Sequence, residues 1–196
     1  RLVMARLREC QIKLKRKKCL FFQTQVEFLG HCVGGGVVTP VLDKLAAVRD
    51  WPQPHTETAL RGFLGLAGYY SDFVDGFSEM AAPLSELSKD EHDVAADWNE
   101  DCTRAFEKLK RALTSAPVLR LADPELPYQI YVDASLVAVG SVLMQQRPDD
   151  QRAHPVSYFS KKLGKAERRY GATARELLGL VVTLRKWRHY LLGSKQ

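Results

Sequence analysis

The stretch Tyr128-Gln129-Ile130-Tyr131-Val132-Asp133 predicts a β-strand, because it is rich in apolar and aromatic residues and turn material follows at once over 134–138. Two more strands are predicted at 139–145 and 155–160, with a polar turn between them. Three consecutive short strands with short connections form an antiparallel meander. The C-terminal third of the chain is therefore expected to contain a small antiparallel sheet.

One long helix is predicted after this sheet, from Ala166 to Leu192. Apolar residues recur along it at helical spacing, so we expect a packing face made of Leu177, Val181, Leu184 and Leu191. The predicted order in this part of the chain is strand, strand, strand, helix.

Before Ala116-Pro117 the apolar residues follow a helical period, and a domain boundary or long connector is expected there. The last helix before that point should place Ala105, Phe106, Leu109 and Leu113 inward, and Thr56 or Thr58 can cap an earlier one. The predicted helices run from Thr39-Pro40 to Trp51, from Thr56 to Phe77, from Ala82 to Leu87 and from Cys102 to Ser115.

Three glycines, Gly62, Gly65 and Gly68, stand at every third position of the helix predicted over 56–77. Glycine lowers helix stability, so these residues suggest that another backbone approaches closely on that side. A neighbouring helix is the more ordinary explanation, and a nucleic-acid strand is the other.

The N-terminal segment predicts a basic helix over 2–14, a basic turn over 15–18 and then a small hairpin unit. Its strands are predicted at Cys19–Phe22 and Val26–Val33, and Gly34-Gly35-Gly36 ends the second strand with a turn.

Charge is distributed unevenly within a net charge of +6. Residues 1–18 contain eight Lys or Arg against one acid, residues 161–195 contain ten against two acids, and residues 86–101 are acidic. Two basic ends around an acidic middle fit a polyanion that is contacted at two places. Solvated helix faces would give the same pattern, so both interpretations stay open here.

The composition, 45% hydrophobic and 27% charged over 196 residues, is ordinary for a globular protein and suggests neither a disordered nor a fibrous chain. The length leaves room for one large domain or two small ones, and we expect two. The four cysteines form no CxxC pair and no metal-finger spacing, which predicts a reduced, intracellular protein of the cytoplasm or nucleus. No apolar run approaches membrane-spanning length, so no membrane partner is expected. The chain begins at Arg1 without an initiator Met, and we expect it to be part of a longer protein.

Two carboxylates are candidate metal ligands. Asp133 ends a strand at the rim of the predicted sheet, and Glu176 lies in the long helix beside Leu177-Leu178, where packing over the meander would bring it towards that strand end. Converging carboxylates favour Mg²⁺ or Mn²⁺, which can activate water for phosphodiester hydrolysis. A turn-capping role for Asp133 and an ion pair of Glu176 with Arg169 or Arg175 are the structural alternatives.

A series of sequence motifs resembles the reverse transcriptases of gypsy-type (Ty3-like) long-terminal-repeat retrotransposons, in the order found in their Pol polyproteins. Residues Lys18–Phe22 and Val26–His31 resemble the end of the polymerase palm. The thumb is matched by Trp51–Pro54, Leu60–Leu66 and Tyr69-Tyr70. The connection segment is matched by Ala82–Leu84, Trp98 and Leu113–Leu119. The opening of the ribonuclease H (RNase H) domain is matched by Tyr131–Ser135, Gly140, Pro155-Val156, Tyr170 and Glu176–Leu178.

The resemblance implies an α+β fold: a mostly helical thumb and connection, followed by an RNase H-like three-stranded antiparallel meander and helix, truncated. The implied domains are 1–38, the end of the palm with a hairpin like the primer grip; 39–117, the thumb and connection; and 118–196, the N-terminal half of an RNase H domain. The implied function is that of a fragment of a reverse transcriptase and ribonuclease H, which binds an RNA–DNA hybrid or a primer–template duplex.

The resemblance also implies residue roles. Asp133 and Glu176 match the first two metal-binding acids of the RNase H site, with Mg²⁺ or Mn²⁺ as cofactor. Contacts with nucleic acid are expected from the turn over the Phe28-Leu29-Gly30-His31 motif and from the thumb helix. The candidate nucleic-acid-binding residues are Phe28, Leu29, Gly30, His31, Arg61, Gly62, Gly65 and Ser135.

The departures from the family pattern leave enzyme activity open. The polymerase aspartates and the later RNase H acids are expected outside these 196 residues, and Ala138 and Gly179 replace a glycine and an alanine common in the family. We therefore expect the chain alone to be inactive. A domesticated or decayed copy that binds nucleic acid or protein, and a piece that serves in a homodimer or with a protein partner, are the alternatives.

Overall fold

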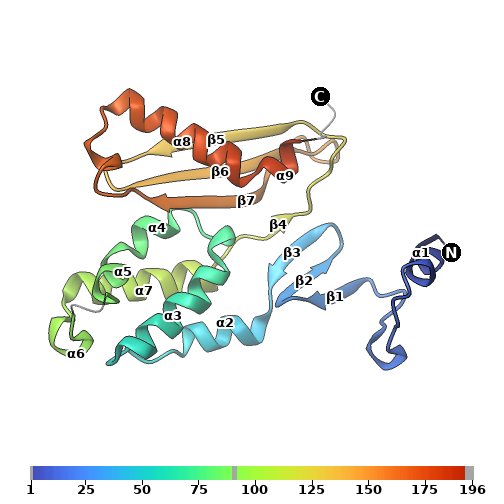
Figure 1. Cartoon of the computed structure of the whole chain (residues 1–196), viewed down its shortest axis with the longest axis horizontal. Helices are drawn as coiled ribbons and strands as arrows, with labels where there is room; N and C mark the ends of the chain where they lie inside the picture. The colour runs from blue at the N-terminus through green and yellow to red at the C-terminus, as the bar shows by residue number, and fades with distance from the viewer. Residues whose placement is uncertain (1, 90–91, 193–196) are drawn as a thin grey trace.

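The computed structural model describes residues 2–89 and 92–192 of the chain, so Arg1 and Lys195 of the two basic ends lie outside the described residues. The elements follow one another as α1 (Leu2–Glu9), η1 (Arg16–Lys18), β1 (Gln25–Phe28), β2 (His31–Gly34), β3 (Val37–Pro40), α2 (Leu42–Arg49), α3 (Glu57–Tyr69), η2 (Ser71–Phe73), α4 (Phe77–Met80), α5 (Ala82–Leu87), α6 (Val94–Asp97), α7 (Glu100–Thr114), β4 (Leu119–Arg120), β5 (Tyr128–Ala134), β6 (Ala138–Gln146), β7 (Ala153–Lys162), η3 (Glu167–Arg169), α8 (Ala172–Lys186) and α9 (Arg188–Leu191). The arrangement is α+β, as predicted (Figure 1).

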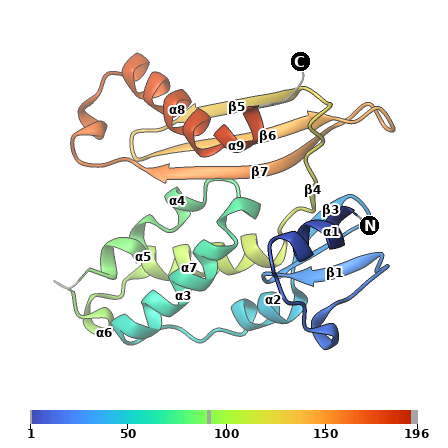
Figure 2. The ribbon, with the colours of Figure 1, turned by 45° about the vertical axis from the view of Figure 1, so that its right-hand side comes forward.

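The fold consists of two antiparallel sheets and a helical region, and the sheets adjoin each other where β4 lies next to β7. The first has the order β1-β2-β3-β4 and the second the order β5-β6-β7. Figure 2 shows α8 running along one face of the second sheet, while α3, α4, α5 and α7 lie together on the side of β7. The second sheet is therefore covered by different helices on its two faces.

The N-terminal hairpin differs from the prediction. Residues 19–22 form no strand, and the strand predicted over Val26–Val33 is two strands, β1 and β2, joined by a tight turn at Leu29-Gly30. Leu29 and Gly30 have φ of 47° and 71°, which is the left-handed backbone that a two-residue hairpin turn requires. The strand pattern did not show this turn because leucine rarely adopts such a conformation. The family resemblance did imply a turn over Phe28-Leu29-Gly30-His31, and that expectation is confirmed.

The helical region has its own apolar core. Thr56 caps α3 by accepting a hydrogen bond from Ala59 N at 3.2 Å, as predicted, but the helix ends at Tyr69 rather than at Phe77. The helix predicted from Thr39-Pro40 begins only at Leu42, because Thr39 and Pro40 belong to β3. The core is filled by fully buried side chains, among them Leu60, Phe63, Leu84, Leu109 and Leu113. Within the described part of the chain, every helix is too short or too polar to cross a membrane.

The meander of β5, β6 and β7 confirms the prediction, with strands slightly longer than expected. β6 lies in the centre, and its side chains alternate between the two faces. Ser141 faces α8, because its hydroxyl lies 2.9 Å from that of Thr183. Ser160, which pairs with the neighbouring Gly140, faces the other side, where it accepts a hydrogen bond from Ser78 N in α4 at 2.7 Å.

The predicted C-terminal helix is interrupted, and its predicted packing face is wrong for three of its four residues, since only Leu191 packs against the core. Helix α8 ends at Lys186, and it packs on the sheet through Gly179, Thr183 and, just beyond its end, Trp187. A Cβ at Gly179 would lie 3.1 Å from Val132 Cγ1, so glycine permits the close approach. A leucine side chain would not fit in that space. Three of the four residues predicted to face the sheet are instead exposed by 38% or more: Leu177, Val181 and Leu184.

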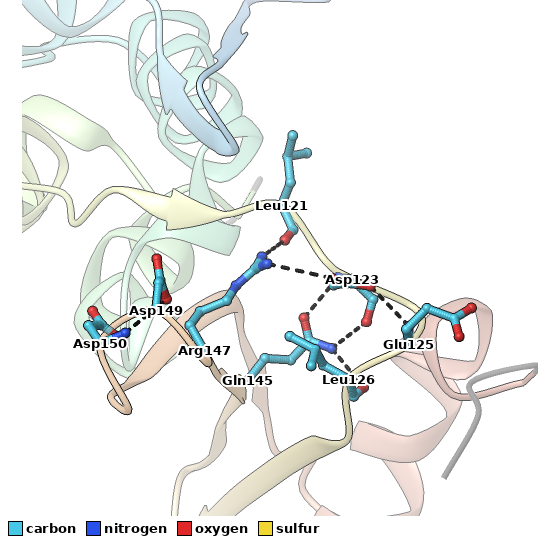
Figure 3. A network of polar contacts seen from close by, with 8 residues as sticks. All are labelled: Leu121, Asp123, Glu125, Leu126, Gln145, Arg147, Asp149 and Asp150. Atoms are coloured by element: carbon cyan, nitrogen blue, oxygen red, sulfur yellow. Dashed lines mark hydrogen bonds and ion pairs between the residues drawn. The ribbon is translucent and has the colours of Figure 1, made fainter.

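The connector between the two sheets is held by one buried side chain (Figure 3). Gln145 accepts a hydrogen bond from Asp123 N at 2.9 Å and donates to Asp123 O at 2.7 Å and to Leu126 O at 3.0 Å. Arg147 adds a hydrogen bond to Leu121 O. Side chains at the end of β6 and just after it therefore hold the segment that links β4 to β5.

Candidate nucleic-acid interface and carboxylate site

The hairpin turn presents two apolar side chains to solvent. Phe28 is 64% exposed and Leu29 70% exposed, and they directly precede Gly30 at the point where β1 turns into β2. His31 faces the helical region instead, since its ring stacks on that of Tyr69 at 5.3 Å between centroids. The turn itself is thus available for contact, whereas His31 serves to pack it.

The glycines of α3 face different surroundings. A Cβ at Gly62 would lie 3.6 Å from the Trp51 ring, whereas at Gly65, outside its own helix, no described atom lies within 4 Å. The backbone predicted to approach this face is therefore not found among the described residues, since Gly62 meets a tryptophan side chain and Gly65 and Gly68 face open space. Gly65 is open to a molecule from outside. Arg61 lies on the same helix and is engaged inside the chain, by Glu57 Oε1 at 2.6 Å and by Ser88 O at 3.3 Å.

Asp133 stands near the end of β5, exposed, and pairs with Gly140 of β6. Because Val132 faces α8, its neighbour Asp133 points to the opposite face of the sheet. There it lines a pocket with Asp75 and Glu79, which come from the loop before α4 and from α4 itself. These two acids were missed by sequence reasoning, because they lie far from Asp133 along the chain and no spacing relates them.

Glu176 is exposed on α8, one turn before Gly179. Gly179 packs against Val132 and Val139, so the turn that contains Glu176 lies beyond them, towards the end of β5. The helix therefore brings Glu176 to the same end of the sheet as Asp133, as predicted, but from the other face. Within residues 2–89 and 92–192, no three His, Cys, Asp or Glu side chains gather as a metal-binding group.

Ser135 has a structural use in the turn between β5 and β6. Its hydroxyl donates to Ala138 O at 3.1 Å and accepts from Ala138 N at 3.0 Å and Val137 N at 3.2 Å. Such a pattern closes a turn locally. The turn thereby holds the end of β5, and with it Asp133, in place.

The helical region and the second sheet are joined by polar contacts. Lys162 lies 3.1 Å from Glu86 and Lys186 lies 3.3 Å from Asp72, in addition to the bond between Ser78 and Ser160. Hydrogen bonds from Lys89 and Lys162 lower the pKa of Glu86 to about 2. Glu86 therefore stays ionised over most of the pH range and keeps this contact.

Comparisons with known proteins identify the family. The family described as "RNase H-like domain found in reverse transcriptase" matches residues 98–196, half of the chain. The chain belongs to this family. The polyproteins of transposons Tf2-3 and Tf2-4 of Schizosaccharomyces pombe (strain 972) are each 37% identical to it over 189 residues. The match covers 96% of the chain but 14% of each polyprotein, so the chain spans about one seventh of their length.

The fold is also that of solved reverse transcriptases. A foamy viral protease-reverse transcriptase in complex with RNA/DNA hybrid superposes with a TM-score of 0.77 over 90% of this chain and 24% of its own, at 23% identity. The same viral protein in complex with dsDNA gives a TM-score of 0.75 over 90% of this chain and 36% of its own, also at 23% identity. This similarity confirms the predicted fold class.

The family assignment confirms the resemblance seen in the sequence: the chain contains an RNase H-like domain of the kind found in reverse transcriptases, and it is similar to transposon polyproteins over nearly its whole length. The match begins at Trp98, whereas the sequence placed the start of this part at residue 118. β4, which lies just after that predicted boundary, pairs with β3 of the first sheet. The domain limits and the roles of the individual site residues stay predictions.

Proposed function

We propose that this chain holds an RNA–DNA hybrid or a primer–template duplex within a retroelement reverse transcriptase and ribonuclease H. The observation that carries the proposal is the 37% identity to Tf2 polyproteins over nearly the whole chain. The fold agrees with it, because the similar viral structures are complexes with RNA/DNA hybrid and with dsDNA. Reverse transcriptases with RNase H domains generally use divalent metal ions.

The hairpin turn and helix α3 supply the contact surface in this proposal. Exposed apolar side chains at Phe28 and Leu29 can pack on sugars and bases at a duplex end. Gly65 leaves space for a sugar–phosphate backbone to approach α3 closely. Arg61 would contact phosphate only if it left Glu57 and Ser88, so we assign it a lesser part than the sequence predicted.

Asp133 and Glu176 would provide oxygen ligands for Mg²⁺ or Mn²⁺ in the RNase H reaction. The donor chemistry fits, because hard divalent ions prefer carboxylates and both side chains are exposed at one end of the sheet. When bound, the ion supplies an activated water and stabilises the leaving oxygen of the RNA phosphodiester. Asp133 is held for this role by the Ser135 turn, and Glu176 by the packing of α8. Two acids are fewer than such a site uses, and we propose that later segments of the polyprotein complete it.

A non-catalytic module that binds a protein, or a second copy of the chain, is the second candidate. The observation that favours it is the apolar outer face of α8, where Leu177, Leu180 and Leu184 are between 41% and 61% exposed. Apolar groups gathered on one helix face are typical of an interaction surface.

Binding of a labelled RNA–DNA hybrid, followed by fluorescence anisotropy over a range of salt concentrations, tests the proposal. We expect affinity to fall steeply with salt, because contacts with phosphates release counterions. Leu29→Ala should weaken binding, whereas Leu42→Ala, a leucine 80% exposed at the start of α2, should not. Equal effects of the two variants, or an affinity independent of salt, would favour the protein-binding module.

Incubation of the same hybrid with Mn²⁺ tests the metal site. We expect no cleavage by this chain, because two carboxylates are only part of a catalytic site. Efficient cleavage that is abolished by Asp133→Asn would overturn this expectation and would mean that the chain carries a complete site.

A further inference from the structure

Two adjacent tyrosines at the end of α3 hold the hairpin turn. Tyr69, the last residue of the helix, donates its hydroxyl to Leu29 O, and Tyr70, which caps the helix end, donates to Gly30 O at 2.9 Å. Gly30 O also accepts Val41 N at 3.4 Å. Two consecutive carbonyls of the turn are thus bound to two consecutive tyrosine side chains at the end of a helix.

The rings of the same tyrosines enclose the residue that follows the turn. His31 stacks on Tyr69, with 9° between the ring planes, and meets Tyr70 edge-on at 5.7 Å between centroids. A third ring, that of Phe73 in η2, lies 5.6 Å away. Edge-on and stacked arrangements at these distances are favourable for aromatic rings.

The fit around Gly30 is tight, so that any other residue would have to displace a neighbouring tyrosine slightly. A Cβ at Gly30 would lie 3.3 Å from Tyr69 Cε1 and 3.4 Å from Tyr70 Oη, and its φ of 71° disfavours any side chain as well. Tyr70 is 1% exposed, and burial raises the pKa of its phenol, so that it stays a proton donor. Both the turn, through Gly30, and the helix end, through Tyr70, are therefore suited to this contact.

We propose that Tyr69 and Tyr70 are positioning residues that lock the Leu29-Gly30 turn to the end of α3, so that turn and helix meet a duplex as one rigid surface. The duplex part of this inference rests on the proposed function. Preorganised contact surfaces bind more tightly because less conformational freedom is lost on binding. Leu29 has a positive φ, which is a strained conformation for leucine, so this turn needs contacts from the rest of the chain to keep it in place.

Tyr69→Phe, Tyr70→Phe and the double variant test the lock, because each keeps the ring and removes one hydroxyl. The matched control is Tyr128→Phe, which makes the same change in β5. Amide hydrogen exchange of residues 28–31 should become about fivefold faster for each hydroxyl removed, because one hydrogen bond stabilises the closed turn by a net free energy of about 1 kcal/mol. Exchange in the rest of the chain should stay as in the wild type.

Affinity for the RNA–DNA hybrid provides the second readout. The double variant should bind about threefold to tenfold more weakly with an unchanged salt dependence, because no phosphate contact is removed. Unchanged exchange at the turn, or faster exchange throughout the chain, would overturn the lock. Faster exchange at the turn with unchanged affinity would overturn its role in binding. A wild-type chain that binds no hybrid would overturn the proposed function and the duplex part of this inference, while exchange would still decide the lock itself.

Discussion

Replacement of Gln145 by methionine should lower the stability of the chain strongly, although the two side chains have similar length. Gln145 is fully buried and makes three hydrogen bonds to the connector, through Asp123 N, Asp123 O and Leu126 O. A buried polar group left without a partner costs about 1–3 kcal/mol. Water can reach part of the connector, so we expect a loss of about 2–4 kcal/mol rather than the full sum.

Urea unfolding followed by circular dichroism measures this loss as a lower transition midpoint with an unchanged slope. The control is Gln146→Met at the next position, where the side chain is exposed and donates to Gln151 O at 3.1 Å. We expect the control to change stability by less than about 0.5 kcal/mol. If Gln145→Met cost no more than its neighbour, the connector would not depend on this side chain.

Three further outcomes are expected from substitutions in the helical region. Gly65→Ala should stabilise the chain by up to about 1 kcal/mol, since its methyl meets open space, yet weaken hybrid binding; Gly62→Ala, whose methyl meets Trp51, should affect binding less. Thr56→Ala should cost about 1 kcal/mol in urea unfolding through loss of the α3 cap. The pKa of Glu86 is lower in the folded chain than in the unfolded one. The stability that its bonds to Lys89 and Lys162 contribute is therefore present above the ordinary pKa of 4.5 and is lost as pH falls towards 2. Melting temperatures of Glu86→Gln and wild type should accordingly differ at pH 6 and converge near pH 2.

The second sheet could be predicted well because its strands carry their own signals. Alternating side chains over 128–134 and clear turn residues after each strand define the meander without reference to any other part of the chain. The cap at Thr56 and the inward face of α7 were likewise local features. Where pattern and packing agree, the sequence is sufficient to predict the element.

The face that α8 turns to the sheet could not be predicted in this way. Apolar residues were expected inward, but the sheet surface is close to the helix and favours a small residue at Gly179 and a hydroxyl at Thr183 that meets Ser141. Trp187 fills the remaining space and donates to Ser157 Oγ at 3.2 Å. Polar residues can replace apolar ones in such an interface when their hydrogen bonds are satisfied, and hydrophobicity alone does not reveal this.

The same limit applies to the two carboxylates. Asp133 and Glu176 reach one end of the sheet, but Asp133 points to the face of α4 and Glu176 comes from the helix on the face opposite. An ion shared by both would have to lie at the rim, beyond the end of β5, rather than on either face. Ligands that complete such a site must approach this rim from outside the pair, and the acids nearest to Asp133 across the pocket, Asp75 and Glu79, belong to the helical region. The geometry of the rim, as well as the number of acids, therefore decides whether this end of the sheet can bind a metal ion.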